Sequence, residues 1–444
     1  MISIIIDLLH IYHHHIHQHI HLNHRILASK FSGVSSSPQP SSSSSSSSST
    51  TISTLSNYSP SSSPLSTTSS TVTLTRFNHR RSSFDYGNDD DNNNIDNGFK
   101  SEKLPVAGLS NLGNTCYMNS VIQALFATKS FRDFLMANHE HGQLYSALSR
   151  LFKEMSSSIR YGHVNPSQFR STFIQLEPKF NGCEQQDAQE FLSYVINDLH
   201  EELNKPRSRS SRSSAIMLEP KSAQEAWSIY RDRYNDSKLV DIFVGQYASV
   251  IKCSYCGNES TCWDPFWDLP LPVPRNRNRI DIDECIAEFT SAEILDGNEQ
   301  PFCSRCKQHR KSTKRLSIVR SPKILVIHLK KFSNNGYKLS SDINVNQQIR
   351  IDNGSSSSSS SSSTMVTYEL YGCVCHHGYL SRSGHYTAYC QYEQQRWYHC
   401  DDQKVRDCTD SFSMATLKDA YVLFYRQQDH YSSSNTNTRY SSRL

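Results

Sequence analysis

The chain has 444 residues, with 46 Lys and Arg against 42 Asp and Glu, which gives a formal net charge of +4. A charge this small for the length provides no concentrated basic face, so the sequence predicts no nucleic-acid partner. The hydrophobic fraction is only 36% because serine-rich tracts dilute it, and the remaining sequence has enough apolar residues to bury a core.

The 13 cysteines are odd in number, and four of them form two Cys-x-x-Cys pairs. This pattern is typical of metal-binding and catalytic thiols in a reducing compartment rather than of a disulfide framework. The first nine residues are apolar, but Asp7 interrupts them and no Lys or Arg precedes them. They make a poor signal peptide and are too short to span a membrane. We therefore expect a monomeric intracellular protein of the cytoplasm, the nucleus or both, without a transmembrane segment, and leave weak membrane contact of the N-terminus open.

The N-terminal region is compositionally biased. Residues 35–70 are mostly Ser, Thr and Pro, and residues 88–97 are mostly Asn and Asp. Neither stretch can bury enough apolar surface to offset the entropy of ordering the chain. The histidines of residues 10–24 could bind a metal, but their low-complexity context favours an unstructured tract. We predict that residues 1–103 are a disordered His-, Ser- and Asn-rich region.

Varied sequence over residues 104–428 predicts one folded domain, followed by a disordered tail at residues 429–444. An Arg-Ser run near residues 205–222 and a serine tract near residues 353–364 are typical of surface loop insertions. Apolar spacing predicts helices over residues 119–127, 144–155 and 185–203. Strands are predicted over residues 239–252, 323–332, 368–375, 385–392 and 420–425. Helices first and strands later indicate an α+β arrangement with a cleft between the two parts.

Cys116 directly precedes a predicted helix and follows Gly113 and Asn114. A cysteine at a helix N-terminus lies at the positive end of the helix dipole, near free N–H groups that favour the reactive thiolate. Gly113 and Asn114 can take the tight backbone that such a turn needs. Taken alone, the pattern also fits an ordinary core or loop cysteine.

Residues 108–125 resemble the Cys box of the ubiquitin-specific proteases almost position for position. In that family the cysteine is the nucleophile, and the asparagine five residues before it supplies an oxyanion-stabilising amide. The resemblance therefore implies Cys116 as the nucleophile and Asn111 as an oxyanion donor. A side-chain amide and the backbone N–H of Cys116 could both donate to a tetrahedral oxyanion.

A thiol protease needs a histidine beside the nucleophile and a polar group that fixes its tautomer. The chain has 20 histidines, but residues 384–390 resemble the family's His box and mark His385 as the general base. His376 and His377, just upstream, are interpreted as loop residues near the cleft. Residues 397–402 resemble the last catalytic motif of the family. That resemblance assigns the orienting role to Asp401 and leaves Asp402 as an alternative or supporting group.

One difference of detail and one further match accompany these motifs. Cys400 stands where an aromatic residue is common in the family, which could loosen the packing behind Asp401 without removing a catalytic atom. Residues 182–192 resemble the glutamine-rich box, whose aspartate contacts the extended C-terminal tail of ubiquitin, and this implies Asp187 as a substrate-binding residue. An acidic residue suits a tail that carries arginines. Asp187 and Glu190 also suit the first turn of a helix, and the two interpretations are compatible.

The two Cys-x-x-Cys pairs are Cys253 with Cys256 and Cys303 with Cys306. Each pair can place two thiolates on one metal ion, and together they complete a tetrahedral all-cysteine site. No βαβ pattern surrounds either pair, which argues against thioredoxin-like redox chemistry. Because four thiolates leave no open position, we predict a structural Zn²⁺. The family resemblance agrees, since many members hold zinc at the tip of a finger-like sheet.

The resemblance extends over about residues 107–427. It implies a papain-like ubiquitin-specific protease fold with a helical thumb, a β-sheet palm and zinc-bearing β fingers. It also implies a thiol-dependent deubiquitinase that cleaves the (iso)peptide bond at the C-terminal glycine of ubiquitin, with ubiquitin and ubiquitinated proteins as partners. Two alternatives stay open: a protease of a ubiquitin-like modifier, and a catalytically weak ubiquitin-binding module.

Overall fold

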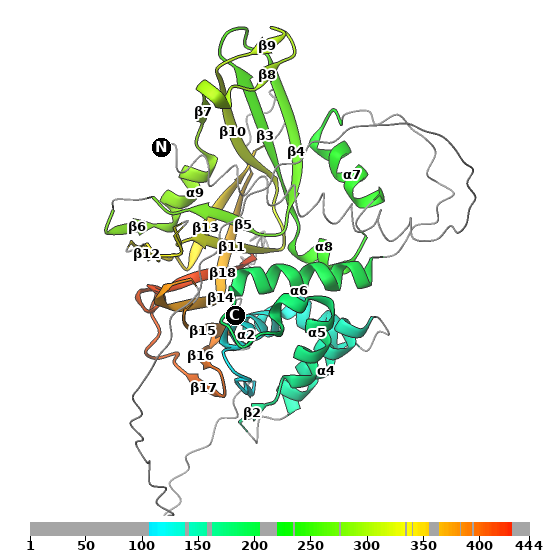
Figure 1. Ribbon diagram of the computed structural model, residues 1–444, viewed down its shortest axis with the longest axis vertical. Helices are drawn as coiled ribbons and strands as arrows, with labels where there is room; N and C mark the ends of the chain where they lie inside the picture. Colours follow the sequence, from blue (N-terminus) through cyan, green and yellow to red (C-terminus); the bar gives the residue numbers. More distant parts are fainter. Residues whose placement is uncertain are drawn as a thin grey trace, which may run out of the picture. The chain divides into compact units, whose positions relative to one another are not determined.

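The helical part of the fold is built around α2 (Cys116–Ala127), in which every residue is buried. Its other helices are α3 (Lys129–Met136), α4 (Gln143–Ser157), α5 (Ser167–Leu176), the 3-10 turn η2 (Pro178–Asn181), α6 (Ala188–Leu203) and α8 (Lys238–Phe243). Helices α3 and α6 both pack against α2, and α4 packs against α3, α5 and α6. Figure 1 shows α4, α5 and α6 toward the end of the described chain that is opposite the β8–β9 hairpin.

An eight-stranded sheet, called here the palm sheet, lies against the helical part. Its strand order is β17-β16-β15-β14-β18-β11-β5, and β13 also pairs with β14. The bounds are β5 (Leu269–Pro272), β11 (Ile324–Lys330), β13 (Gln348–Asn353), β14 (Thr364–Leu380), β15 (Ser383–Gln391), β16 (Trp397–Asp401), β17 (Lys404–Asp407) and β18 (Ala420–Gln427). All of these pairings are antiparallel except that of β11 with β5.

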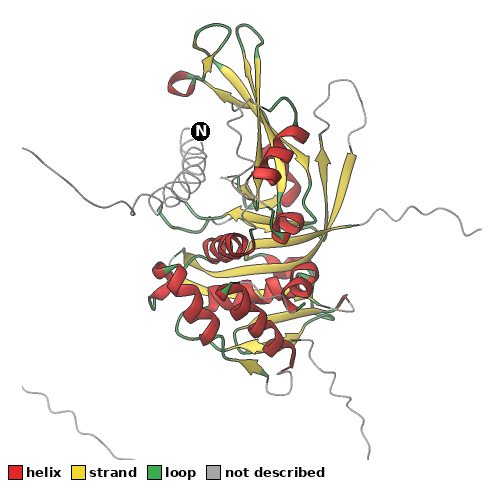
Figure 2. Cartoon of the chain, turned by 90° about the vertical axis from the view of Figure 1, so that its right-hand side faces the viewer, coloured by secondary structure: helices red, strands yellow, loops and turns green. Residues whose placement is uncertain are grey.

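A second, four-stranded sheet, called here the finger sheet, has the order β4-β3-β10-β7. Its strands are β3 (Gly245–Cys253), β4 (Glu259–Phe266), β7 (Glu293–Leu295) and β10 (Ser312–Arg320). The short hairpin of β8 (Phe302–Cys303) and β9 (Gln308–His309) lies at its far end, called here the fingertip, as Figures 1 and 2 show.

The remaining elements connect these parts. They are β1 (Gly108–Leu109), β2 (His163–Val164), α7 (Ala223–Arg233), β6 (Arg279–Asp281), α9 (Ile282–Thr290), η4 (Gly297–Glu299), β12 (Asp342–Asn344) and η6 (Met414–Leu417). Strands β1 and β2 pair in parallel, as do β6 and β12. Among the described residues, no helix is long and apolar enough to cross a membrane.

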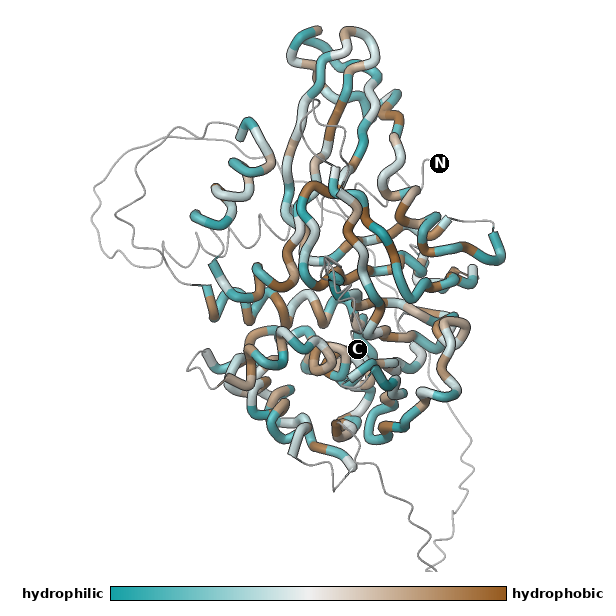
Figure 3. The backbone as a smooth tube through the Cα atoms, turned by 180° about the vertical axis from the view of Figure 1, so that it is seen from behind, coloured by the Kyte–Doolittle hydropathy of each residue, from teal (hydrophilic) through white to brown (hydrophobic). Residues whose placement is uncertain are grey.

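Burial on both faces of the palm sheet explains its apolar strands. In β18, Val422 and Phe424 face the core shared with the helices, whereas Leu423 and Tyr425 face a second core on the other side. This is the alternation that a strand imposes on successive side chains. Figure 3 shows the corresponding apolar segments concentrated in the interior, with hydrophilic segments at the fingertip.

The predicted helices and strands are confirmed with one exception. Residues 239–252 were expected to form one strand, but they divide into α8 and β3. Leu239, Val240, Ile242 and Phe243 are all buried, and their spacing suits one face of a helix that packs on α3 and α6. The prediction was wrong there because the run was too short to separate the two periodicities.

The computed structural model describes residues 106–137, 142–157, 162–204, 220–233, 236–274, 277–333, 335–339, 341–354, 364–381, 383–392 and 395–428. The predictions of disorder for residues 1–103 and 429–444 lie outside the described residues. So do most of the two predicted loop insertions, although Asn353 already belongs to β13 and Thr364 to β14.

Candidate active site and metal centre

The loop before α2 places Cys116 at the first residue of that helix, with its side chain only 1% exposed. Gly113 and Asn114 have φ angles of +96° and +52°, in the left-handed region that Gly and Asn tolerate best. Asn114 also donates from Nδ2 to the carbonyl oxygen of Cys183 at 2.8 Å. The predicted tight turn ahead of Cys116 is therefore present and is fixed against the segment that precedes α6.

His385 and Asp401 come from neighbouring antiparallel strands, β15 and β16. The Nε2 atom of His385 lies 2.7 Å from Oδ1 of Asp401. His385 also shares a side-chain hydrogen bond with Cys116. The structure thus brings three predicted residues from distant parts of the chain into one line.

The electrostatics of this line favour a charged imidazole. The pKa of His385 is raised to about 9, mainly by its hydrogen bond with Cys116 and further by that with Asp401, while burial opposes both. Burial alone would raise the pKa of Asp401, but the hydrogen bond and charge of His385 outweigh it and lower that pKa. A protonated His385 at neutral pH is the form that stabilises a neighbouring thiolate.

Asp402 has a different set of partners from Asp401. Its Oδ2 accepts a hydrogen bond from Asn111 Nδ2, and its Oδ1 accepts one from Asn119 Nδ2, both at 2.8 Å. Its backbone oxygen accepts from the N–H of Leu109, also at 2.8 Å. Asp402 therefore ties the turn after β16 to the loop before α2, which joins the strands that carry the imidazole to the helix that carries the thiol.

A close backbone approach makes this junction possible. A Cβ atom on Gly108 would lie 2.2 Å from the carbonyl oxygen of Gln403, so only glycine fits beside the turn. Sequence reasoning did not identify Asn119 as part of the site. Its position one helical turn after Cys116 was the available signal, since residues i and i+3 lie on the same face of a helix.

Asn111 is exposed and lies beside this junction. Its Oδ1 accepts hydrogen bonds from the backbone N–H groups of Gly113 at 3.0 Å and Thr115 at 3.2 Å, which orients the amide. Its Nδ2 donates to Asp402. Because an amide nitrogen carries two hydrogens, this arrangement leaves a second N–H for a further acceptor.

Asp187 is the N-cap residue of α6. Its Oδ1 accepts from the backbone N–H groups of Gln189 at 2.7 Å and Glu190 at 3.2 Å, and its Oδ2 accepts from the hydroxyl of Tyr421 at 2.5 Å. Burial raises its pKa despite these bonds. The expectation that Asp187 suits the start of a helix is confirmed, although it caps α6 rather than lying in its first turn. Its contact with a substrate stays a prediction.

His376 and His377 lie inside β14 and pair with β15, so the interpretation of both as loop residues was wrong. The ring of His376 is fully buried, and a Cβ on Gly384 would lie 2.8 Å from its Nε2. His377 bonds Thr387 Oγ1 at 2.9 Å and Asp419 Oδ2 at 3.2 Å. Burial lowers the pKa of both imidazoles, so both favour the neutral form.

Four cysteine sulfurs converge at the fingertip. The Sγ atoms of Cys253, Cys256, Cys303 and Cys306 all lie within 4.8 Å of one another, and those of Cys256 and Cys303 are 3.6 Å apart. Tetrahedral bonds of about 2.3 Å to one ion would separate the sulfurs by about 3.8 Å. The four side chains therefore fit a single tetrahedral metal ion.

The two halves of this cluster have the same backbone design. The N–H of Gly257 donates to the carbonyl of Cys253 at 2.9 Å, and the N–H of Lys307 donates to that of Cys303 at 2.8 Å. Gly257 and Lys307 have φ angles of +68° and +56°, so each pair is followed by a left-handed residue that closes a tight knuckle. Two such knuckles facing each other are the arrangement that all-cysteine metal sites use.

A protein-family model described as ubiquitin carboxyl-terminal hydrolase matches residues 107–425. The match includes every residue assigned above to the thiol, imidazole and carboxylate line and to the cysteine cluster. The chain belongs to the ubiquitin carboxyl-terminal hydrolase family, which confirms the membership that the sequence motifs indicated.

Two human relatives show how much of the chain is covered by this similarity. Human ubiquitin carboxyl-terminal hydrolase 2 is 36% identical over 337 residues, which cover 72% of this chain and 55% of the relative. Human ubiquitin carboxyl-terminal hydrolase 21 is 34% identical over 353 residues, covering 72% and 61%. The chain spans about half the length of the rat, cattle and human hydrolase 2 relatives, and 93% of the chicken one is covered at 37% identity.

A solved structure with the same fold is Ubp8 in a SAGA DUB module bound to monoubiquitin. It matches with a TM-score of 0.59 and 25% identity, covering 74% of this chain and 70% of that one. The predicted α+β fold with thumb, palm and fingers is thereby confirmed.

Proposed function

We propose that this protein is a thiol-dependent deubiquitinase that hydrolyses the (iso)peptide bond at the C-terminal glycine of ubiquitin and removes ubiquitin from protein conjugates. The observation that carries the proposal is the line from Cys116 through His385 to Asp401, with the 2.7 Å contact between the imidazole and the carboxylate. Such a line activates a thiol for attack on a carbonyl carbon.

In the first step, the sulfur of Cys116 attacks the carbonyl carbon of the terminal glycine of ubiquitin. His385 gives its proton to the departing lysine amine as the carbon–nitrogen bond breaks, which leaves a thioester on Cys116. In the second step, His385 takes a proton from water, and the resulting attack on the thioester releases the ubiquitin carboxylate and the thiolate. Asp401 holds the imidazole in the orientation that both steps require.

The oxyanion of each tetrahedral intermediate needs donors that are fixed in advance. The backbone N–H of Cys116 and the second N–H of Asn111 have this role in our proposal. Asp402 supports it indirectly, because its hydrogen bond at 2.8 Å holds the Asn111 amide in one orientation. The two aspartates thus divide the work, with Asp401 orienting the imidazole and Asp402 positioning the oxyanion loop.

Ubiquitin is the proposed partner because of the family and the fold. The structural neighbour Ubp8 belongs to a module that was solved bound to monoubiquitin. The tail of ubiquitin would enter between the helical part and the palm sheet and pass the N-terminus of α6, where Asp187 faces basic side chains of that tail. The palm and the fingers would hold the globular part.

We propose that the metal at the fingertip is a structural Zn²⁺ bound by Cys253, Cys256, Cys303 and Cys306. An all-sulfur tetrahedral set of this size suits zinc. The bound ion would supply cross-links between two knuckles that are otherwise joined by short β strands, so its contribution is to stability of the finger sheet.

Two alternative functions share this fold. A protease of a ubiquitin-like modifier would use the same line of residues on a different tail. A ubiquitin-binding module would retain the surface but lack turnover, and the intact contact between His385 and Asp401 argues against it. Turnover of fluorogenic ubiquitin in parallel with fluorogenic ubiquitin-like modifiers separates all three. We expect ubiquitin to give the highest kcat/KM. Faster turnover of a ubiquitin-like modifier would contradict the assignment of ubiquitin as the substrate. Absence of turnover of every substrate would contradict the proposed protease activity.

The domain boundaries also belong to this proposal. We infer that residues 104–428 form the catalytic domain, since the family match of residues 107–425 falls inside them. The monomeric state and the intracellular location, in cytoplasm or nucleus, stay predictions.

A further inference from the structure

A single side chain joins the loop before α6 to the strand that carries His385. Gln185 lies in that loop, and its Nε2 donates a hydrogen bond to the backbone carbonyl oxygen of Gly384, 199 positions further along the chain. Gly384 directly precedes His385 in β15. The bond therefore holds the peptide unit at which the residue that carries the imidazole begins.

The palm sheet supports the backbone at His385 less completely than it supports the rest of β15. Among the described residues, β16 pairs only with residues 388–391 of β15. On the other side, His385 pairs with His377 of β14, and the register of this ladder shifts immediately beyond that pair. Gly384 falls in the irregular part of the ladder. Regular strand pairing therefore constrains the peptide bond between Gly384 and His385 less firmly than the peptide bonds that follow it.

Gly384 gives this peptide additional freedom. Its φ angle is +147°, in a region that glycine adopts far more easily than other residues. A Cβ atom at this position would lie 2.4 Å from the carbonyl oxygen of His377, so the close approach of β14 requires glycine. Rotation of the peptide after Gly384 would turn the Cα–Cβ bond of His385 and move its imidazole relative to Cys116. A hydrogen bond from outside the sheet can prevent this rotation.

The loop that carries Gln185 is anchored on both sides. Before Gln185, the carbonyl oxygen of Cys183 accepts a hydrogen bond at 2.8 Å from Asn114 Nδ2, in the turn ahead of α2. After Gln185, Asp187 caps α6. The backbone on either side of Gln185 is thus tied to the two helices, and the bond to Gly384 connects this fixed loop to β15.

The oxygen of the same amide has no comparable role. Oε1 of Gln185 is buried, and no described residue donates a hydrogen bond to it. A buried acceptor without a donor lowers the stability of a fold. Stability of the fold therefore does not explain a glutamine at this position, whereas the bond from its Nε2 to Gly384 offers a different reason.

We propose that Gln185 is a positioning residue for the reaction: its amide holds the peptide between Gly384 and His385 so that the imidazole meets the sulfur of Cys116. The inference rests on the proposed function, because it assigns a further residue to that reaction. A displacement of about 1 Å in reacting groups can cost roughly 10²-fold in rate. Loss of the Gln185 donor should therefore slow the chemical steps and have little effect on the binding of ubiquitin.

The first test measures turnover of fluorogenic ubiquitin by the full chain carrying Gln185→Met or Gln185→Glu. Both substitutions keep a side chain of similar length and remove the donor. We expect kcat to fall by roughly 10–100-fold and KM to change by less than about threefold. The matched control is Gln168→Met, which changes an exposed glutamine of α5 and should leave both constants at their wild-type values.

Two outcomes of this test would overturn the proposal. A rise in KM at unchanged kcat would mean that Gln185 binds the tail of ubiquitin instead of positioning the imidazole. A Tm of Gln185→Met more than about 5 °C below that of wild type would mean that the lost activity follows from lost structure. We expect the Tm of this variant to stay close to that of wild type, because the substitution also removes the buried Oε1.

The second test does not depend on ubiquitin. The rate at which iodoacetamide alkylates Cys116 at pH 7 depends on the imidazolium beside the sulfur, and mass spectrometry of the Cys116 peptide measures it. This rate should be roughly tenfold lower in Gln185→Met than in wild type and unchanged in Gln168→Met. Equal rates in Gln185→Met and wild type would overturn the proposal. A wild-type protein that turns over no ubiquitin but shows this difference in alkylation would contradict the proposed function and support the positioning role of Gln185.

Discussion

The cysteine that begins α2 and the four cysteines at the fingertip show how the same type of side chain can have two different chemical roles. Cys116 stands alone beside the imidazole of His385, whose raised pKa of about 9 favours an ion pair with a single thiolate. The fingertip sulfurs face one another within 4.8 Å, so their negative charges need a shared cation. The number and charge of the neighbours, rather than the residue itself, determine whether a thiol reacts or binds metal.

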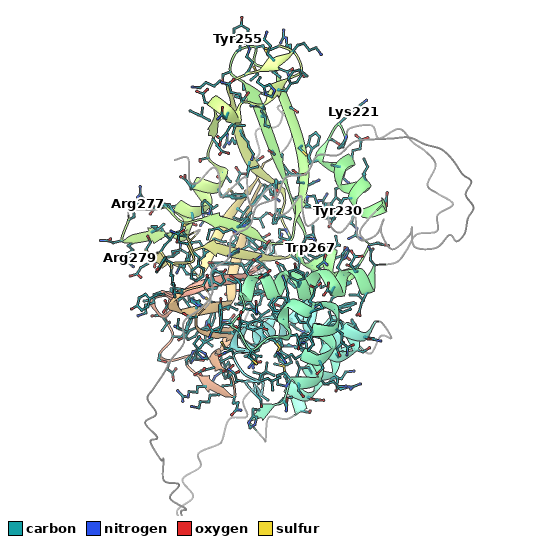
Figure 4. The ribbon with its side chains drawn as sticks, viewed as in Figure 1. Lys221, Tyr230, Tyr255, Trp267, Arg277 and Arg279 are labelled. Atoms are coloured by element: carbon teal, nitrogen blue, oxygen red, sulfur yellow. The ribbon has the colours of Figure 1, made fainter. Side chains whose placement is uncertain are left out.

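The two regions also differ in their surroundings. Cys116 is buried between the helices and the palm sheet, where its position depends on long-range contacts. The fingertip is exposed: Tyr255 of the first knuckle, labelled at the tip in Figure 4, is 76% exposed. The geometry of the fingertip depends on two short segments. We therefore expect substitutions near Cys116 to affect catalysis, and substitutions at the fingertip to affect stability.

Replacement of the His385 imidazole is expected to have the largest effect on activity. His385→Gln should lower kcat/KM for fluorogenic ubiquitin by roughly 10⁴-fold, because the thiol loses its base and the leaving amine its acid. The matched control is His377→Gln, which changes the residue opposite His385 in the β14–β15 ladder and should cost less than about tenfold. A control as inactive as His385→Gln would show that both histidines take part in the chemistry.

Replacement of Asp401 should have the next largest effect. Asp401→Asn should reduce kcat by roughly 10²–10³-fold, because the imidazole loses its orienting charge. The carboxylate raises the pKa of His385, and the imidazolium is lost as pH rises through about 9. The alkaline fall of kcat/KM should therefore lie near pH 9 in wild type and move to lower pH in Asp401→Asn. A pH–rate profile measures both, and an unmoved alkaline limb would contradict the assigned contact.

Replacement of Asp402 should change the pH–rate profile differently from replacement of Asp401. Asp402→Ala removes the acceptor that holds Asn111 and Asn119, so kcat should fall by roughly 10–100-fold through a misplaced oxyanion donor. The alkaline limb should stay near pH 9, because the contact between His385 and Asp401 remains. If that limb shifts as it does in Asp401→Asn, the proposed division between the two aspartates is wrong.

The smallest effect on turnover is expected at the fingertip. Cys303→Ser should release the metal, measured by elemental analysis, and lower Tm by about 5 °C or more, while turnover of a minimal substrate changes by less than about tenfold. Cys262→Ser, which alters an exposed cysteine of β4 outside the cluster, is the control and should retain metal and Tm. Full metal content in Cys303→Ser would contradict the four-sulfur site.

Sequence reasoning predicted the residues of the site better than the contacts among them. Cys116, His385 and Asp401 lie in recognisable motifs, and the structure brings them together. The hydrogen bonds of Asp402 with Asn111 and Asn119 were not predictable, because they depend on how β1 meets the turn after β16 in space. Motifs record which side chains a site needs, whereas the junction between two distant segments depends on tertiary packing.

The fold shows the same limit. The buried face of α6 follows from a local pattern and was predicted. The predicted helix began at residue 185 and therefore placed Asp187 inside the first turn, whereas Asp187 is the N-cap residue. The division of residues 239–252 into α8 and β3 was missed, since an apolar run of this length fits either periodicity.

The central claim is that Cys116 is the nucleophile that receives the C-terminus of ubiquitin. The most direct test is covalent labelling with ubiquitin that carries an electrophile at its C-terminus, followed by mass spectrometry of the modified peptide. We predict that wild-type protein gains one ubiquitin on Cys116 and that Cys116→Ala protein gains none. Equal labelling of Cys116→Ala, or a label on Cys183 in the facing segment, would contradict the account.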